Sequence, residues 1–157
     1  FARHLEGAFV AAVWLADSRR LLIANDRFGL YPLYLARRPG TFLCAPEMKA
    51  VLADPSLPRH LDRTALAEYL RFQHLLGERT FFEEVELLPP GSLLRVDAAT
   101  AGCSLETYWT PAELPHRPNV TFGEAVEEIG RLMRRAVRRM SGDELRPGVF
   151  LSGGLDS

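Results

Sequence analysis

Short apolar runs separated by turn residues fill the first 45 residues of the chain. The runs cover 8–15, 20–26, 32–36 and 41–45, and the turns between them contain Asp17-Ser18, Gly29 and Pro39-Gly40. Strands of this length joined by short connections are typical of antiparallel sheets. The pattern therefore predicts a four-stranded antiparallel meander at the start of the chain.

A helical pattern replaces the apolar runs after the predicted meander. One short helix is expected over 47–53 and a second over 62–72. Asp62 is a good N-cap for the second helix, because its carboxylate can accept hydrogen bonds from the free N–H groups of the first turn. Further along, the pattern predicts a strand over 92–96 and a short extended piece at 108–109. Antiparallel strands that precede separate helices indicate an α+β arrangement.

The last third of the chain has a different organisation. Residues 111–120 carry three prolines and no periodicity, so a linker is expected there. Thr121 and Glu124 fit a capping box, and apolar residues then recur at steps of three and four over 122–140. A strand is predicted over 149–151. A helix followed by a strand and a loop is typical of the start of an α/β unit with a parallel sheet.

Composition limits the classes of partner. Hydrophobic residues make up 47% of the chain, and the net charge of −1 gives no reason to expect nucleic acid or an anionic membrane as a partner. No apolar stretch approaches the roughly 20 residues of a membrane span. Cys44 and Cys103 lack a metal-binding spacing, and Cys44 is expected to be a small buried side chain. A reducing, cytoplasmic location is expected.

The most specific motif follows the predicted strand over 149–151. It consists of Ser152, Gly153, Gly154, Leu155, Asp156 and Ser157. Paired glycines let the backbone curl tightly around a ligand, and the flanking serines add hydroxyl donors. A helix that begins there would direct the positive end of its dipole at an anion. The motif lacks the lysine of a Walker A loop, and it resembles the PP-loop of ATP pyrophosphatases.

Stretches in the middle of the chain resemble the class II glutamine amidotransferase domain. Residues 26–34 (DRFGLYPLY) resemble its D-R-x-G-x-K-P-L-Y-Y stretch, 5–9 (LEGAF) its L-x-G-x-F strand entry, and 45–50 (APEMKA) its A-S-E-x-K-A element. The stretches 62–91 and 108–109 are similar to the segment that joins this domain to a synthetase domain. With the PP-loop motif in this order, the chain resembles the glutamine-hydrolysing asparagine synthetases over essentially its whole length.

This resemblance implies an α+β part followed by an α/β part. Residues 1–110 would form the C-terminal part of a glutaminase domain of the N-terminal-nucleophile type, a sandwich of antiparallel sheets with helices. Residues 111–120 would form a linker, and 121–157 would contain the first helix and strand of a parallel PP-loop domain. The chain is accordingly expected to be a fragment of a longer cytoplasmic enzyme.

The resemblance also implies an activity. In these enzymes ammonia from glutamine passes through a tunnel to a second site, where ATP converts the aspartate side chain into an acyl-adenylate. ATP and Mg²⁺ are the implied cofactors, and ATP, aspartate and glutamine are the implied small-molecule partners. By resemblance Ser152, Gly153, Gly154 and Ser157 would hold the pyrophosphate, Leu151 and Leu155 would border the nucleotide, and Asp156 would help to place Mg²⁺. Asp156 has an alternative role as the N-cap of a following helix.

The sequence departs from the family pattern at several points. The family's glutaminase nucleophile is a cysteine at the mature N-terminus, whereas Phe1 stands first here, so no catalytic residue of the glutaminase is expected in this chain. Asn25, Tyr31 and Pro46 replace an arginine, a lysine and a serine. Two alternatives stay open: a related synthetase that closes a β-lactam or peptide ring, and a non-catalytic binding module. The oligomeric state, a homodimer among the options, also stays open.

Overall fold

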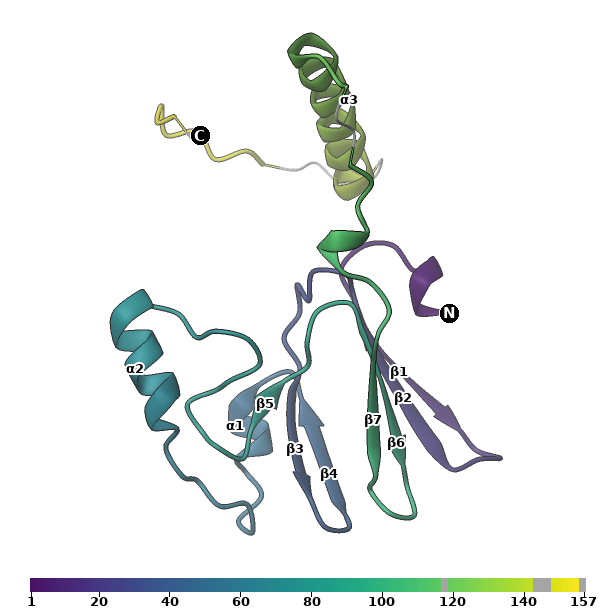
Figure 1. Ribbon diagram of the computed structural model, residues 1–157, viewed down its shortest axis with the longest axis vertical. Coiled ribbons are helices and arrows are strands. Elements are labelled where there is room, and N and C mark those ends of the chain that lie inside the picture. The colour runs from purple at the N-terminus through teal and green to yellow at the C-terminus, as the bar shows by residue number, and fades with distance from the viewer. Residues whose placement is uncertain (117–118, 143–147, 156–157) are drawn as a thin grey trace. The chain divides into compact units, whose positions relative to one another are not determined.

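The computed structural model describes residues 1–116, 119–142 and 148–155 of the chain. They fall into two compact units, Phe1–Leu114 and Pro115–Ser157 (Figure 1). All the strands described lie in the first unit, and the second unit contains one long helix. The division falls inside the predicted linker over 111–120, while the expected domain assignments themselves stay predictions. None of the helices in the described ranges is both long and apolar enough to span a membrane.

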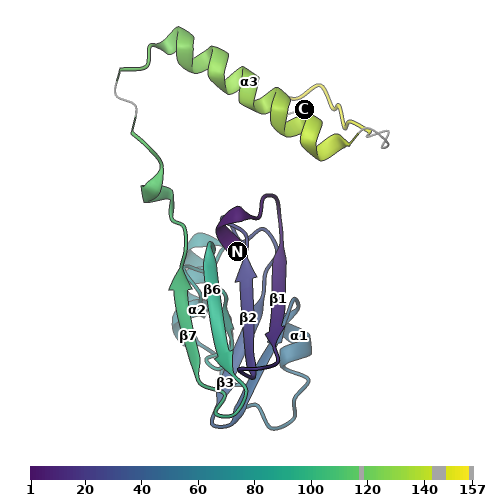
Figure 2. The same ribbon diagram turned by 90° about the vertical axis from the view of Figure 1, so that its right-hand side faces the viewer.

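The strands of the first unit form two antiparallel sheets. The first sheet has the order β1 (Val10–Leu15), β2 (Arg20–Asn25), β6 (Ser92–Asp97) and β7 (Cys103–Thr107), and Figure 2 shows these strands side by side. The second sheet has the order β4 (Thr41–Ala45), β3 (Tyr34–Arg38) and β5 (Glu86–Leu87). This confirms the expected α+β class with antiparallel sheets.

The five main predicted strands are confirmed to within two residues, but the predicted meander is wrong. β1 pairs with β2 and β3 pairs with β4, whereas the second neighbour of β2 is β6. The reason is the connection over 26–33, which is too long for a tight hairpin and carries the chain from one sheet to the other. The pattern does not predict β5, which has only two residues, or β7, which ends just before the predicted extended piece at 108–109.

The main core lies between the two sheets. Side chains from both sheets and from the segments beside them are buried together there: Ile23, Leu33, Leu35, Leu88, Leu94 and Val96. Ala36 follows Leu35 in β3 and faces the other way, where it packs with Val51 of α1 (Met48–Val51), Leu57 and Val85. Each fully buried aliphatic side chain of this size stabilises the fold by about 1.5–3 kcal/mol.

The edge strands leave apolar side chains in contact with solvent. Among the described strands β1 pairs only with β2, and Trp14 on β1 is 54% exposed. Val13 and Leu15 of the same strand are also exposed. Cys44, on the edge strand β4, is exposed as well, so the expected burial of Cys44 is wrong. Its position on an edge of the second sheet leaves the side chain without a covering neighbour on one side.

Asn25 joins three parts of the first unit through buried hydrogen bonds. Its side-chain amide donates to the Pro89 carbonyl oxygen at 2.8 Å, and its side-chain oxygen accepts from the Ser92 N–H at 2.9 Å. The Tyr108 hydroxyl donates to the main-chain carbonyl of Asn25 at 2.6 Å, and burial raises the pKa of Tyr108, which keeps this donor protonated. Asn25 is only 1% exposed, so these polar groups depend on one another rather than on water.

Asp26 shapes the loop that follows β2. Its carboxylate accepts hydrogen bonds from the N–H groups of Phe28 at 3.0 Å, Leu30 at 3.2 Å and Phe9 at 3.2 Å. Its main-chain carbonyl accepts from the N–H of Gly91 at 2.9 Å. A single residue, 3% exposed, therefore holds the chain where it leaves the first sheet for the second.

The two longer helices begin at the predicted caps. The Asp62 carboxylate accepts from the N–H groups of Thr64 and Ala65 at the start of α2 (Arg63–Phe72). In the second unit, α3 (Phe122–Ser141) follows a complete capping box: the Glu124 N–H donates to the Thr121 hydroxyl, and the Thr121 N–H donates to the Glu124 carboxylate. Both N-terminal signals are thus confirmed.

The predicted strand over 149–151 is not found. Within the described residues 148–155 there is neither helix nor strand. A strand is defined by hydrogen bonds to a neighbouring strand, and the described part of this unit contains no other strand that could provide them. The parallel α/β part therefore stays a prediction.

Replacing Asn25 by alanine is expected to lower the free energy of unfolding by about 2–4 kcal/mol, because the Ser92 N–H and the Pro89 carbonyl lose their buried partner. Urea denaturation followed by tryptophan fluorescence measures this change. The control is Asn119→Ala, at an exposed position, which should stay within about 0.5 kcal/mol of the parent chain. Equal stabilities of the two variants would contradict the role given to Asn25.

The main-chain and side-chain hydrogen bonds of Thr121 hold the pKa of Glu124 below its ordinary value. A lowered pKa means that the ionised carboxylate stabilises the helix above the unfolded-state pKa, and that this contribution disappears as the pH falls through the folded-state pKa. The helical circular dichroism signal should therefore decrease below about pH 5. Glu124→Gln should weaken this pH dependence, and Glu127→Gln should keep it. Matching profiles for Glu124→Gln and the parent chain would argue against the capping box as the cause.

Candidate functional site

The predicted phosphate-binding segment forms a bend in the second unit. Gly153 has a φ of 79°, a left-handed conformation that glycine adopts without the steric cost of a Cβ. The Gly154 N–H donates to the Ser152 hydroxyl oxygen at 3.3 Å, so this serine folds back over the bend. The backbone conformation at this position therefore favours glycine, and it is compatible with a turn that contacts a ligand closely.

The structure brings together only part of the predicted nucleotide site. Ser152, Gly153 and Gly154 are neighbours in the bend, and Leu151 and Leu155 are fully or largely exposed beside it. Asp156 and Ser157 lie outside the described residues, so the magnesium and pyrophosphate roles expected for them have no geometry here. An exposed bend of small residues offers N–H and hydroxyl donors, which suits an anion such as pyrophosphate.

A second surface feature, in the first unit, is an apolar pocket beside the loop that Asp26 shapes. The pocket has a volume of about 350 Å³, and Arg27, Phe28, Pro90 and Trp109 contribute to its lining. The rings of Phe28 and Trp109 meet edge to face with centroids 5.2 Å apart, and the Arg27 guanidinium lies 5.9 Å from the centre of the Trp109 ring. Such a wall suits an apolar or aromatic group and contains no acid or base for catalysis.

Close backbone contacts fix the wall of this apolar pocket. Gly29 has a φ of 59°, and a Cβ there would lie 3.2 Å from the Pro90 side chain. At Gly91 a Cβ would lie 2.5 Å from the carbonyl oxygen of Trp109, closer than real side chains approach. Glycine is therefore required at both turns, and the two connections that flank the pocket are packed directly against each other.

Another pocket, of about 730 Å³, is lined by β3, by the segment over 76–87 and by Leu94 and Leu105 of the first sheet. Its basic residues are already paired. Arg37 forms an ion pair with Glu86, and Arg79 forms ion pairs with Glu68 at 3.0 Å and Asp62 at 3.7 Å. A small anion would have to displace one of these carboxylates, so the pocket lacks a ready anion-binding group.

The three positions that depart from the family motifs have different surroundings. Asn25 is buried in the hydrogen-bond set described above, whereas Tyr31 is 57% exposed and Pro46 is exposed. The sequence pattern misses the role of Asn25 because an apolar strand gives no sign that its last polar residue is buried. Glu47 and Lys49, beside Pro46, form an exposed ion pair at 2.6 Å.

Neither cysteine has the surroundings of a nucleophile. Cys44 is exposed in β4, and Cys103 begins β7. Burial raises the pKa of the Cys103 thiol, which favours the neutral and less reactive form. No histidine ring contacts either sulfur in the described residues. The expectation that this chain lacks the glutaminase nucleophile stays a prediction.

Known proteins resemble this chain over both units. The family model of the glutamine amidotransferase domain matches residues 1–109. Asparagine synthetase [glutamine-hydrolyzing] 3 of Bacillus subtilis (strain 168) is 31% identical over 155 residues, which are 98% of this chain and 25% of the relative. Carboxyethyl-arginine beta-lactam-synthase of Streptomyces clavuligerus is 31% identical over 157 residues, 99% of this chain and 27% of the relative.

A third relative is amidase chyE of Penicillium rubens (strain ATCC 28089 / DSM 1075 / NRRL 1951 / Wisconsin 54-1255). It is 30% identical over 160 residues, which cover 100% of this chain and 23% of that protein. The chain thus spans about a quarter of the length of the curated relatives it matches. The resemblance inferred from the sequence motifs is confirmed, and the chain belongs to the glutamine amidotransferase domain family and is a relative of the glutamine-hydrolysing asparagine synthetases.

Proposed function

We propose that the complete protein is an ATP-dependent amidotransferase that makes asparagine from aspartate, with glutamine as the source of ammonia. The observation that carries this proposal is the extent of the similarity. The match to asparagine synthetase 3 covers 98% of the chain, so it continues beyond the amidotransferase domain, which ends at residue 109. A protein that only hydrolysed glutamine would have no need of the second unit and its phosphate-binding motif.

In this proposal the bend of the second unit holds the pyrophosphate part of ATP. Ser152, Gly153, Gly154 and Ser157 supply N–H and hydroxyl donors, and Leu151 and Leu155 border the nucleotide. The left-handed backbone at Gly153 supports this role, because it turns the chain without a side chain in the way. Asp156 offers the carboxylate oxygen that Mg²⁺ prefers, and the ion would neutralise phosphate charge.

The proposed chemistry requires these donors at the leaving group. A carboxylate oxygen of aspartate attacks the α-phosphorus of ATP, and the bond from this phosphorus to the pyrophosphate oxygen breaks. Negative charge then grows on the departing pyrophosphate, and fixed donors stabilise that charge as it forms. Ammonia next attacks the acyl carbon, AMP leaves with the bonding electrons, and the nitrogen loses a proton to give the amide.

The first unit belongs to the domain family that supplies ammonia from glutamine. Its cysteines, Cys44 and Cys103, lie within the chain and therefore lack the free α-amino group that an N-terminal cysteine nucleophile uses as its base. The present residues would form the framework of the sandwich. In particular, the hydrogen bonds of Asn25 and Asp26 join the end of β2 to the start of β6 and to the loop that leads to β3.

The second candidate is a synthetase that closes a β-lactam ring. The similarity to carboxyethyl-arginine beta-lactam-synthase is as strong in identity as that to asparagine synthetase 3, at 31% in both cases. Both reactions need a carboxylate activated by ATP, and they differ in the attacking amine, which is internal in ring closure. A cysteine directly after the initiator methionine of the complete protein favours asparagine synthesis, because ring closure needs no ammonia from glutamine.

The test is pyrophosphate release by the complete protein with ATP and Mg²⁺. Release is expected to depend on the acceptor acid, with aspartate and ammonia giving asparagine that is measured by chromatography. Asp156→Ala is expected to reduce the rate by on the order of 100-fold or more, because the metal-held charge stabilisation is lost. Asp17→Ala, in the exposed turn between β1 and β2, is the matched control and should keep the parent rate.

Two results would overturn the assignment. Pyrophosphate release that is unchanged in Asp156→Ala would remove the role given to this carboxylate. Release that requires a β-amino acid with its own internal amine, and that ignores aspartate, would establish ring closure instead.

A further inference from the structure

A histidine and two glutamates from separate segments lie close together in the first unit. His60 precedes α2, and Glu83 and Glu84 precede β5. Main-chain hydrogen bonds join the two segments: the Glu83 N–H donates to the His60 carbonyl at 3.0 Å, and the Asp62 N–H donates to the Phe81 carbonyl at 2.9 Å. Backbone pairing therefore holds the two segments that carry these side chains next to each other.

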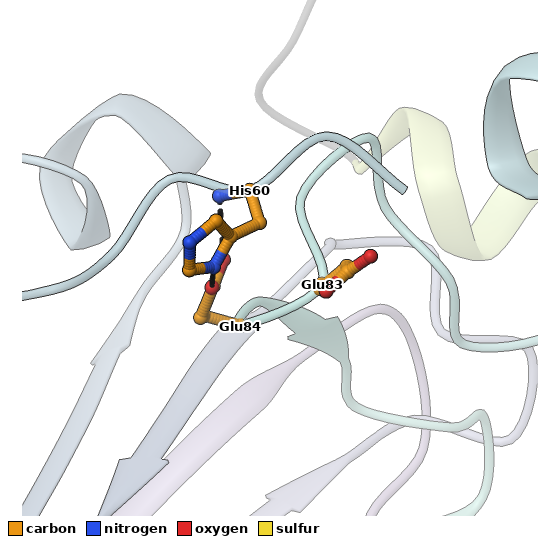
Figure 3. A group of neighbouring side chains, drawn as sticks. All are labelled: His60, Glu83 and Glu84. Atoms are coloured by element: carbon orange, nitrogen blue, oxygen red, sulfur yellow. Dashed lines mark hydrogen bonds and ion pairs between the residues drawn. The ribbon is translucent and has the colours of Figure 1, made fainter. Parts of the chain in front are cut away.

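The His60 and Glu84 side chains already form a pair, and Figure 3 shows them facing each other. The main-chain N–H of His60 donates to one Glu84 carboxylate oxygen at 3.1 Å, and the imidazole Nδ1 of His60 contacts the other carboxylate oxygen. The Glu84 side chain is only 18% exposed, whereas the His60 side chain is 70% exposed. This arrangement fixes the carboxylate while one side of the imidazole faces solvent.

Glu83 adds a second carboxylate beside the pair. One ligand atom from each of the three residues lies within 4.8 Å of the other two. Within the described ranges the Glu83 side chain takes part in no hydrogen bond or ion pair, and Figure 3 shows it to one side of the His60–Glu84 contact. Among the described residues no ion pair joins Glu83 to the nearby Arg59, whose guanidinium donates to the Leu52 carbonyl at 2.8 Å.

We propose that His60, Glu83 and Glu84 bind a divalent transition-metal ion of the Zn²⁺ class. The ion replaces the proton between the His60 Nδ1 and the Glu84 carboxylate, and Glu83 rotates in as the third ligand. Zn²⁺ binds imidazole nitrogen and carboxylate oxygen at about 2.0–2.2 Å, so the His60 and Glu84 ligand atoms move apart to admit the ion and the Glu83 carboxylate turns toward them. Water completes the tetrahedron.

Charge and ligand type decide which ion is preferred. Two carboxylates and a neutral imidazole give the site a charge of about −2, which matches a divalent cation. The imidazole ligand favours Zn²⁺ over Mg²⁺ and Ca²⁺, which prefer oxygen ligands only.

The expected consequence is a cross-link between two segments that otherwise meet through main-chain hydrogen bonds. The segment with His60 leads into α2, and the segment with Glu83 and Glu84 leads into β5 and borders the pocket of about 730 Å³. A bound ion would stabilise the folded first unit and hold this rim of the pocket in place. This role is independent of ATP and of the motif in the second unit.

The test uses Zn²⁺ as the probe and the chain described here. Isothermal titration at pH 7.5 is expected to give one Zn²⁺ per chain, and Zn²⁺ should raise the thermal unfolding midpoint. His60→Ala and Glu83→Gln are each expected to weaken binding by about tenfold or more and to abolish the rise in the midpoint. Glu83→Gln keeps the His60–Glu84 pair, so its metal-free midpoint should equal that of the parent chain.

His74→Ala is the matched control, since His74 is an exposed histidine whose ring contacts only the Phe72 carbonyl and the Phe72 ring in the described structure. It should bind Zn²⁺ like the parent. A large excess of Mg²⁺ should leave Zn²⁺ binding unchanged. Parent-like Zn²⁺ affinity in both His60→Ala and Glu83→Gln, or displacement of Zn²⁺ by Mg²⁺, would overturn the proposal.

Discussion

The buried hydrogen bonds of Asn25 and Asp26 are the constraint on which the first unit depends. They lie where β2 ends and where the chain crosses from the first sheet to the second. Three other segments form hydrogen bonds with these two residues. They are the turn before β6 at Pro89, the residue directly after β7, Tyr108, and the N-terminal segment at Phe9. Because both residues are almost fully buried, these donors and acceptors depend on one another, and they fix the end of β2 against the connections that lead to β3 and β6.

The sequence predicts the parts of this fold that short-range physics determines. The strands before residue 46 and the caps at Asp62 and Thr121 follow from turn residues, apolar runs and side chains that bind nearby N–H groups. The pairing of β2 with β6 does not follow, because it depends on a contact between segments about 70 residues apart. β5 escapes prediction for the same reason, since its two residues form a strand only through β3.

For the candidate sites too, the sequence predicts local backbone conformation but not contacts between distant segments. The conformation of Gly153 agrees with a glycine chosen for its backbone freedom, which is a local property. The strand expected before it would require neighbouring strands, and a local pattern cannot supply them. The grouping of His60 with Glu83 and Glu84 has no sequence signal at all, because only the backbone pairing of two distant segments brings these residues together.

The open side of β1 has a consequence for handling the chain in isolation. Its sequence, VAAVWL, contains no lysine, proline or other charged or strand-breaking residue, and Val13, Trp14 and Leu15 are all in contact with solvent. Natural proteins place charged residues or prolines on edge strands to stop the sheet of one molecule from pairing with the sheet of another. Molecules of this chain should therefore associate edge to edge and precipitate as the concentration rises, and a single lysine introduced into β1 at Val13 should keep them dispersed.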